Sequence, residues 1–368
     1  MTLCKTKYIS NKTILSLGAD SDGGFSVFQN GTIYHQAGFG DLLIDDNFAK
    51  YSNSITAYLR KNKLKPDVIL VDLHPLFKTV ELGEILAKKY EVEVIKIQHH
   101  LAHIFSAYGE YLLNNKVIDK FTGVACDGTG FGLDEKIWGG EIFELQIKSA
   151  KAEKIERVAH LENQVLIGGE MAIREPARVL ISVFGKFLSK DEVFGFVKKY
   201  HSRNEFELLF NQLQEGFNCV ETSSTGRVLD AVAVLLCFSD NQISSKHEAI
   251  KLLEENSGLP FEIEPEIFFD KNTDKYILKT TPLFQYLIKN INKDKKRLAG
   301  TAQLYIAKGL WEIVKKIEDK IFFAGGMANN KIISEYLIKK GVFVNRQIAR
   351  GDGGISFGQI HYYLANIK

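Results

Sequence analysis

The sequence predicts an α/β fold with two lobes, and three features support this prediction. Helical and strand patterns alternate along the first third of the chain, which is typical of α/β domains. One opening pattern, a short strand followed by a glycine-rich turn and a hairpin, occurs near residue 13 and again near residue 121. A length of 368 residues also exceeds what one hydrophobic core usually holds.

The first unit opens with a β-prone run at residues 13–18 and a polar glycine-rich turn at residues 19–24. The pair Asn30-Gly31 then predicts a tight hairpin, because both positions accept a positive φ. Apolar periodicity indicates the later elements. These are helices over residues 55–64, 79–90 and 103–113 and strands over residues 67–72 and 91–98.

The second unit repeats this opening with a strand at residues 121–126, a glycine-rich turn at 127–132 and hairpin strands around 138–145. This repetition predicts the duplicated actin-like ATPase fold, in which a nucleotide lies between two lobes. We place the lobes at residues 1–118 and 119–368, with a helical insertion over about 166–308. Glycine turns are also common in ordinary hairpins, so the pattern alone leaves that reading open.

The last part of the chain returns to alternating elements. We expect a charged surface or loop at residues 290–297, then strands at 320–324 and 342–346 with a helix between them. A final helix should follow Asp352-Gly353-Gly354.

Composition excludes several classes of protein. Hydrophobic residues at 45% and charged residues at 25% are typical of a globular chain rather than a disordered one. A net charge of +2 is too small for a broad positive field, so nucleic-acid binding is disfavoured. The four cysteines form no C-x-x-C pair, which favours a reducing, cytoplasmic setting. The sequence shows neither a signal-like segment nor a long apolar run, so secretion and membrane spanning are not expected.

The segment QHHLAH is the first candidate site. On a helix, residues four apart share a face, so His99 and His103 can direct their imidazoles to one metal ion. The same spacing also fits histidines on a helix surface or in the core, and this alternative stays open.

Glycine-rich turns at strand ends and helix starts are the second candidate. Around Asp127, amides of the glycine turn could hold an anion and the carboxylate could hold a metal, although the turn also fits a plain hairpin. Similar turns lie at Gly325-Gly326 and at Asp352. Because ligands of open α/β sheets bind beyond the strand ends, one shared nucleotide site accounts for these turns together.

Arginines in two polar strings are the third candidate. Arg174 and Arg178 flank a proline, and Arg227 lies in a cap-rich entry into an apolar helix. Such guanidinium groups can hold a phosphate or carboxylate bidentately. Helix capping with surface salt bridges is the alternative.

Several motifs follow one another along essentially the whole chain. They are GFGDL, VDLHP, QHHLAH, CDGTGFGLDEKIWGGE, IGGEMAIREPAR, TSSTGRVLDAVAVLL, FFAGGMANN and GDGGISFGQ. In order and spacing these motifs resemble the C-terminal half of the HypF carbamoyltransferase family. This half of HypF is similar to the threonylcarbamoyl-transferase and O-carbamoyltransferase families, which share the duplicated actin-like fold.

The resemblance implies a site that holds carbamoyl-adenylate between the lobes and passes its carbamoyl group to the C-terminal cysteine of a HypE-like protein, in nickel-iron hydrogenase maturation. It implies a divalent metal, iron or zinc, and ATP or carbamoyl-adenylate as ligands, with Mg²⁺ as a further candidate. By the same resemblance, the metal ligands are His99, His103, Asp127 and Asp352; Gly128, Thr129 and Gly130 face phosphate; Gly325, Gly326 and Asn330 face adenosine; and Arg174, Arg178 and Arg227 steady the mixed anhydride.

The chain also departs from the family pattern. The first glycine turn carries Asp22 where the family usually has a cation, and residues 245–249 differ from the family's string. The resemblance covers the transferase half, so we expect a separate YrdC-like protein to form the adenylate. Asp22 leaves open a degenerate homologue that binds nucleotide or a HypE-like partner without turnover. Because the sequence does not determine the acceptor, an O-carbamoyltransferase that acts on a small molecule is a further alternative.

Overall fold

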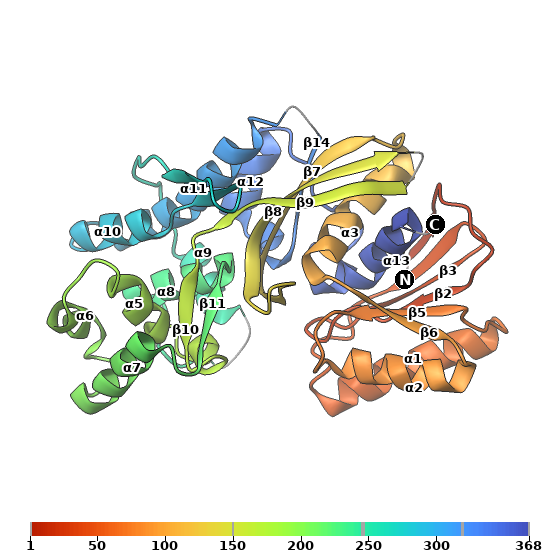
Figure 1. Cartoon of the computed structure of the whole chain (residues 1–368), viewed down its shortest axis with the longest axis horizontal. Helices are drawn as coiled ribbons and strands as arrows, with labels where there is room; N and C mark the ends of the chain where they lie inside the picture. Colours follow the sequence, from red (N-terminus) through yellow and green to blue (C-terminus); the bar gives the residue numbers. More distant parts are fainter. Residues whose placement is uncertain (1, 149–150, 244–246, 318–319, 367–368) are drawn as a thin grey trace.

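The computed structural model describes residues 2–148, 151–243, 247–317 and 320–366. Two β-sheets organise these residues, and two helices lie between the sheets (Figure 1). None of the described helices is long and apolar enough to cross a membrane.

The first sheet consists of β1 (Thr2–Lys5), β2 (Ile14–Ser16), β3 (Phe25–Gln29), β4 (Thr32–Gln36), β5 (Val68–Asp72) and β6 (Glu93–Ile97). Its strand order is β1-β4-β3-β2-β5-β6. β2, β3 and β4 are antiparallel neighbours, whereas β5 and β6 are added parallel to β2. Asn30 has a φ of +47° between β3 and β4, which confirms the predicted hairpin turn.

The second sheet consists of β7 (Lys120–Phe131), β8 (Ile137–Lys148), β9 (Lys151–Leu161), β10 (Gln164–Ile167), β11 (Cys219–Thr222), β12 (Ile267–Asp270), β13 (Lys275–Leu278) and β14 (Lys320–Ala324). β7, β8 and β9 are antiparallel neighbours, and β14 is added parallel to β7. This arrangement repeats that of β2 to β5 in the first sheet. The repetition confirms the predicted duplicated actin-like fold.

Different helices cover the two faces of the first sheet. α1 (Asp45–Lys61) and α2 (Lys78–Tyr90) cover its outer face, while α3 (His99–Asn114) and α13 (Ile355–Asn366) lie toward the second sheet (Figure 1). Side chains alternate along β2 accordingly, because Leu15 packs in the cluster of α1 and α2 and Ile14 packs in the cluster of α3 and α13. α3 also packs on β7 and β14, and α13 packs on α3, β2 and β3.

The remaining helices and turns belong to the second half of the chain. They are α4 (Met171–Arg174), α5 (Ala177–Phe184), α6 (Lys190–Val197), α7 (Arg203–Glu215), α8 (Thr225–Leu235), α9 (Glu248–Glu255), α10 (Thr281–Lys289), α11 (Lys295–Val314), α12 (Lys331–Lys339) and the 3₁₀ turns η1 (Gly326–Asn329) and η2 (Asp352–Gly354). α13 packs on the first sheet although it lies in the range we assigned to the second lobe. The predicted lobe boundary after residue 118 stays a prediction.

Some predicted elements were wrong. The region predicted to be helical, 166–308, also contains β11, β12 and β13, which are too short to show a clear periodicity. The strand predicted at 342–346 is only an isolated bridge between Phe322 and Phe343. The glycine turn predicted at 127–132 lies largely within β7, which has an irregular register between Cys126 and Gly130. α1 begins at Asp45 rather than at residue 55.

Glu162 is a buried carboxylate that ties the end of β9 to the start of α10. It accepts hydrogen bonds from the backbone N–H groups of Thr280 (2.9 Å) and Thr281 (2.8 Å), and Lys279 and Lys186 lie 2.9 and 3.2 Å away. Burial alone raises the pKa of Glu162, but the Thr281 N–H and the two ammonium groups outweigh it and lower the pKa to about 2.

We expect Glu162→Gln to lower the free energy of unfolding by about 2 kcal/mol at pH 7, after allowing for partial exposure to solvent. The folded-state pKa lies below the unfolded one, so this stability is present above about pH 4.5 and is lost as the pH falls toward 2. Urea unfolding at pH 7 and at acid pH checks both expectations. The exposed Glu255→Gln serves as a control, and an equal loss in both variants would contradict the assignment.

Candidate metal and nucleotide site

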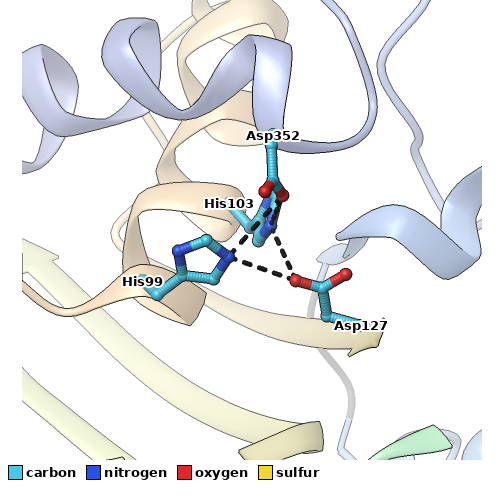
Figure 2. Close-up of side chains that lie close together, drawn as sticks. All are labelled: His99, His103, Asp127 and Asp352. Atoms are coloured by element: carbon cyan, nitrogen blue, oxygen red, sulfur yellow. Dashed lines mark hydrogen bonds and ion pairs between the residues drawn. The ribbon is translucent and has the colours of Figure 1, made fainter. Parts of the chain in front are cut away.

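Four side chains from distant parts of the sequence meet near the N-terminal end of α3 (Figure 2). The Nε2 atom of His99 lies 3.1 Å from Asp127 Oδ2 and 3.7 Å from Asp352 Oδ1. The Nε2 atom of His103 lies 3.4 Å from each of these oxygens. We call His99, His103, Asp127 and Asp352 the metal cluster, since their ligand atoms all lie within 4.8 Å of one another. The structure therefore brings together the four predicted metal ligands.

Local structure places the two histidines on one helix face. Gln98 is the N-cap of α3, and its side chain accepts a hydrogen bond from the Leu101 N–H at 2.9 Å. The helix then begins at His99, so the four-residue spacing directs both rings toward the second sheet. His100 points elsewhere and hydrogen-bonds Gln98 through Nδ1.

Asp72 orients the His99 ring through the ring nitrogen that faces away from the metal cluster. The sequence analysis did not predict this role. His99 Nδ1 lies 2.7 Å from Asp72 Oδ2, and because a carboxylate can only accept, Nδ1 carries the proton. Nε2 is therefore the His99 atom that faces Asp127 and Asp352 and is available to a metal. Carboxylate, histidine and metal are commonly arranged in this way. Asp72 is fully buried at the end of β5, and its place in the VDLHP motif was the available signal.

Backbone amides hold Asp127 so that only one of its oxygens faces the histidines. Asp127 Oδ1 accepts hydrogen bonds from the N–H groups of Gly128 (2.8 Å) and Gly326 (3.2 Å). A Cβ at Gly326 would lie 2.7 Å from this oxygen, and one at Gly130 would lie 2.4 Å from the His100 ring. The missing side chains therefore permit close approach, at Gly130 within β7 and at Gly326 at the start of η1.

Asp352 is positioned by a loop that α3 anchors. Glu110 on α3 accepts hydrogen bonds from the N–H groups of Arg346 (2.8 Å) and Ile348 (2.9 Å). The chain then reaches Asp352 at the start of η2, just before α13. One helix thus supplies two ligands of the cluster and holds the segment that leads to a third.

The charges of the metal cluster depend on one another. Burial raises the pKa of Asp127, but His103 and His99 outweigh it and hold that pKa well below its usual range. Burial lowers the pKa of His99, but Asp72, Asp127 and Asp352 outweigh it and raise that pKa well above its usual range. The cluster therefore gathers positive charge between two carboxylates.

These residues fit a divalent metal. His103 Nε2 is buried, and its polar neighbours in the cluster are two carboxylates at 3.4 Å, which is longer than a good hydrogen bond. Two imidazoles and two carboxylates are a donor set that accepts either zinc or iron. The donor set is consistent with both predicted metals and does not choose between them.

The predicted phosphate- and adenosine-facing residues divide into two groups. Gly128, Gly130, Gly325 and Gly326 lie beside the metal cluster, whereas Thr129 is exposed. Asn330 has a structural role: it accepts a hydrogen bond from Ile333 N–H as the N-cap of α12, and its amide donates to Gln303 Oε1 at 2.6 Å. The expected contact of Asn330 with adenosine stays a prediction.

The structure separates the three predicted arginines. Arg227 is buried on α8, pairs with Asp230 at 2.7 Å, and lies near Gly128, where a Cβ would be 3.7 Å from its Nη2. Its Nε and Nη1 have no partner among the described residues. Arg174 is exposed at the end of α4, and Arg178 pairs with Glu175 at 2.7 Å. Neither is in contact with the metal cluster within the described ranges, so their role at the anhydride stays a prediction.

Asp22 reaches the metal cluster from the first glycine turn. A Cβ at Gly353 would lie 2.7 Å from Asp22 Oδ2, which places this carboxylate next to Asp352. Burial and the charge of Asp352 both raise the pKa of Asp22. Lys246, a cation that could offset Asp22, lies outside the described residues.

Comparisons with known proteins identify the family of this chain. Two family models match, described as "Carbamoyltransferase, Kae1-like Domain, second subdomain" over residues 123–359 and "HypF Kae1-like domain" over residues 9–110. The probable carbamoyltransferase HypF of Methanocaldococcus jannaschii is 37% identical over 98% of this chain and 48% of its own length. The carbamoyltransferase HypF of Rhodobacter capsulatus is 30% identical over 83% of this chain and 40% of its own length.

Solved structures of HypF share the fold. Full-length HypF in a phosphate- and nucleotide-bound form superposes with a TM-score of 0.85 at 25% identity, covering 98% of this chain and 47% of that one. HypF of T. kodakarensis gives a TM-score of 0.84 at 28% identity, covering 99% of this chain and 48% of that one. The chain thus spans about half the length of the relatives it matches.

Fold and site together define a protein of the duplicated actin-like class with a cluster of histidines and aspartates where α3, β7 and η2 meet. Within that class the family matches are decisive, because they cover most of the chain. The chain belongs to the HypF carbamoyltransferase family and corresponds to its Kae1-like part.

Proposed function

We propose that this chain carries the transfer site of a HypF-type carbamoyltransferase. The metal cluster is the observation that carries this proposal, because it lies within the matched Kae1-like regions and joins α3, β7 and η2 at one point. The ligand is carbamoyl-adenylate, bound between the lobes. The acceptor is the C-terminal cysteine of a HypE-like protein, in nickel-iron hydrogenase maturation.

The residues of the site have different roles in the proposed transfer. Held by His99, His103, Asp127 and Asp352, a divalent metal would supply Lewis-acid polarisation of the anhydride oxygens. Asp72 keeps the His99 ring in one orientation through its 2.7 Å hydrogen bond. The unpaired Nε and Nη1 of Arg227 can donate to phosphate oxygens near Gly128.

The transfer step balances without any redox change. The acceptor thiolate attacks the carbamoyl carbon and forms a C–S bond. The bond from that carbon to the phosphate oxygen breaks, and AMP leaves with the electron pair. Stabilising the charge on the phosphate therefore favours departure of AMP, which is the task that we assign to Arg227.

We expect this chain to transfer a carbamoyl group only when a YrdC-like protein supplies the adenylate. The test combines the chain, ATP and carbamate, which carbamoyl phosphate yields with phosphate on hydrolysis, with and without that protein. It measures pyrophosphate release and the mass of a C-terminal cysteine peptide. Pyrophosphate release and peptide carbamoylation are expected only when the YrdC-like protein is present.

Control arms separate the alternatives. A matched peptide with serine in place of the terminal cysteine should remain unmodified. Adenylate formation by this chain alone would contradict the need for a YrdC-like partner. Transfer to a small hydroxyl compound but not to the cysteine peptide would favour an O-carbamoyltransferase.

Asp22 favours a second candidate function, a homologue that binds nucleotide or a HypE-like partner without turnover. At an effective dielectric constant of about 20, a carboxylate about 4 Å from a phosphate costs about 4 kcal/mol before screening. Calorimetric titration of ATP into the wild type and Asp22→Lys, with and without Mg²⁺, compares the candidates. A wild type that does not bind ATP, with affinity gained only in Asp22→Lys, supports the degenerate homologue and contradicts the enzyme. If the wild type binds ATP, the transfer assay above separates the enzyme from a homologue that binds nucleotide without turnover.

A further inference from the structure

His247 is an exposed histidine at the N-cap position of α9, and it does not belong to the metal cluster. Its φ is +67°, in the left-handed region that glycine adopts most readily. Its side chain makes no hydrogen bond that caps α9. Local conformation therefore favours glycine at this position, and helix capping does not explain a histidine.

The ring of His247 faces two glycines that hold Asp127. Its Cε1 atom lies 3.9 Å from the position of a Cβ at Gly128 and 3.9 Å from that of a Cβ at Gly326. These glycines belong to β7 and η1, and their N–H groups donate to Asp127 Oδ1. Because Cε1 lies between the two ring nitrogens, the polar edge of the imidazole is directed toward this part of the site.

The imidazole of His247 is available to a bound molecule. Its nitrogens have no hydrogen-bond partner among the residues that the structure describes, and the side chain is exposed, so a ligand can reach it. An imidazole carries a proton on at least one of its two nitrogens in every protonation state found in proteins. His247 therefore offers at least one free N–H donor next to the two glycines.

The charged groups around these glycines already have partners. Arg227 Nη2 lies 3.7 Å from the position of a Cβ at Gly128 and pairs with Asp230 at 2.7 Å. Asp127 is held by the two glycine N–H groups and by the histidines of the metal cluster, and Asp352 lies against the same histidines. A divalent metal in the cluster adds positive charge on this side when it is bound.

We propose that His247 is a further nucleotide-binding residue, which donates a hydrogen bond from its ring to a phosphate oxygen beside Gly128 and Gly326. This inference rests on the proposed function, which places the phosphate of the adenylate near Gly128. His247 lies within residues 245–249, where the chain departs from the family pattern. The contact is therefore particular to this chain rather than one that the resemblance implies.

The test compares the binding of AMP and of adenosine by the wild type and His247→Gly, in calorimetric titrations of the whole chain. Glycine suits the left-handed backbone, so the variant should fold with a melting temperature close to that of the wild type. We expect His247→Gly to bind AMP about 10-fold or more weakly, because it loses a hydrogen bond to a charged group. Its affinity for adenosine, which has no phosphate, should equal that of the wild type.

Asp274→Gly is the matched control. Asp274 is exposed in the turn between β12 and β13 and has a φ of +54°, so this variant also removes an exposed side chain from a left-handed residue. We expect Asp274→Gly to bind both ligands as the wild type does. Equal AMP affinities in the wild type and His247→Gly, equal losses for AMP and adenosine, or an equal loss in Asp274→Gly would each overturn the proposal.

The transfer assay with the YrdC-like protein separates this inference from the proposed function. Weaker AMP binding by His247→Gly, together with no transfer by the wild type, supports the role of His247 and contradicts the transfer function. Transfer by the wild type, together with equal AMP affinities, contradicts only the role of His247. A wild type that binds neither AMP nor adenosine contradicts both.

Discussion

The double variant His99→Ala and His103→Ala is expected to lose its metal entirely, from about one divalent ion per chain in the wild type. The two imidazoles are half of the donor set, and Asp127 and Asp352 alone would leave a weak, open carboxylate site. Metal analysis of the purified proteins after dialysis measures the loss. Carbamoyl transfer should disappear with the metal.

Two further variants make this expectation specific. His160→Ala removes a histidine of β9 that bonds the Leu161 carbonyl, and it should leave the metal content unchanged. Asp72→Asn should keep the ligands but weaken metal affinity by about 10- to 100-fold, because Asp72 fixes the His99 ring from behind. Unchanged stoichiometry in the double variant would move the metal elsewhere and contradict the site.

The histidine pair could be predicted from the sequence because its geometry is local. Four-residue spacing on a helix determines that His99 and His103 share a face, whatever the rest of the fold. The partners of this pair are distant in the sequence. The residues alone offered Asp127 as a possible metal ligand, but the family resemblance was needed to join Asp127 and Asp352 to the histidines. Asp72 was missed, since its contact with His99 depends on the parallel register that places Asp72 opposite Ile97 at the ends of β5 and β6.

Glycines were the least certain signal in the sequence. A glycine-rich run indicates a turn when only local conformation is considered. At Gly130, however, the missing side chain allows the His100 ring to approach, and β7 continues through the run. Packing between distant segments decides such cases, and a single sequence does not contain that information.

Arg227 provides the second large expected effect. Its guanidinium is buried beside Gly128, it is paired with Asp230 through Nη2, and its Nε and Nη1 are free of partners in the described part of the chain. If these groups hold the phosphate of the adenylate, Arg227→Lys should lower kcat/KM for carbamoyl transfer by about 100-fold or more, since one ammonium cannot replace the planar fork.

Stability must be separated from chemistry in this experiment, because removing one partner of a buried pair is itself destabilising, by about 3–5 kcal/mol. Asp230→Asn breaks the same pair while keeping the guanidinium, so it reports the structural cost alone. We expect Asp230→Asn to lower thermal stability but to retain most of the transfer activity, whereas Arg227→Lys loses activity while its metal content and circular dichroism stay normal. Free guanidinium should partly rescue Arg227→Ala. Equal losses of activity in Arg227→Lys and Asp230→Asn, with no rescue, would mean that Arg227 only supports the fold of α8.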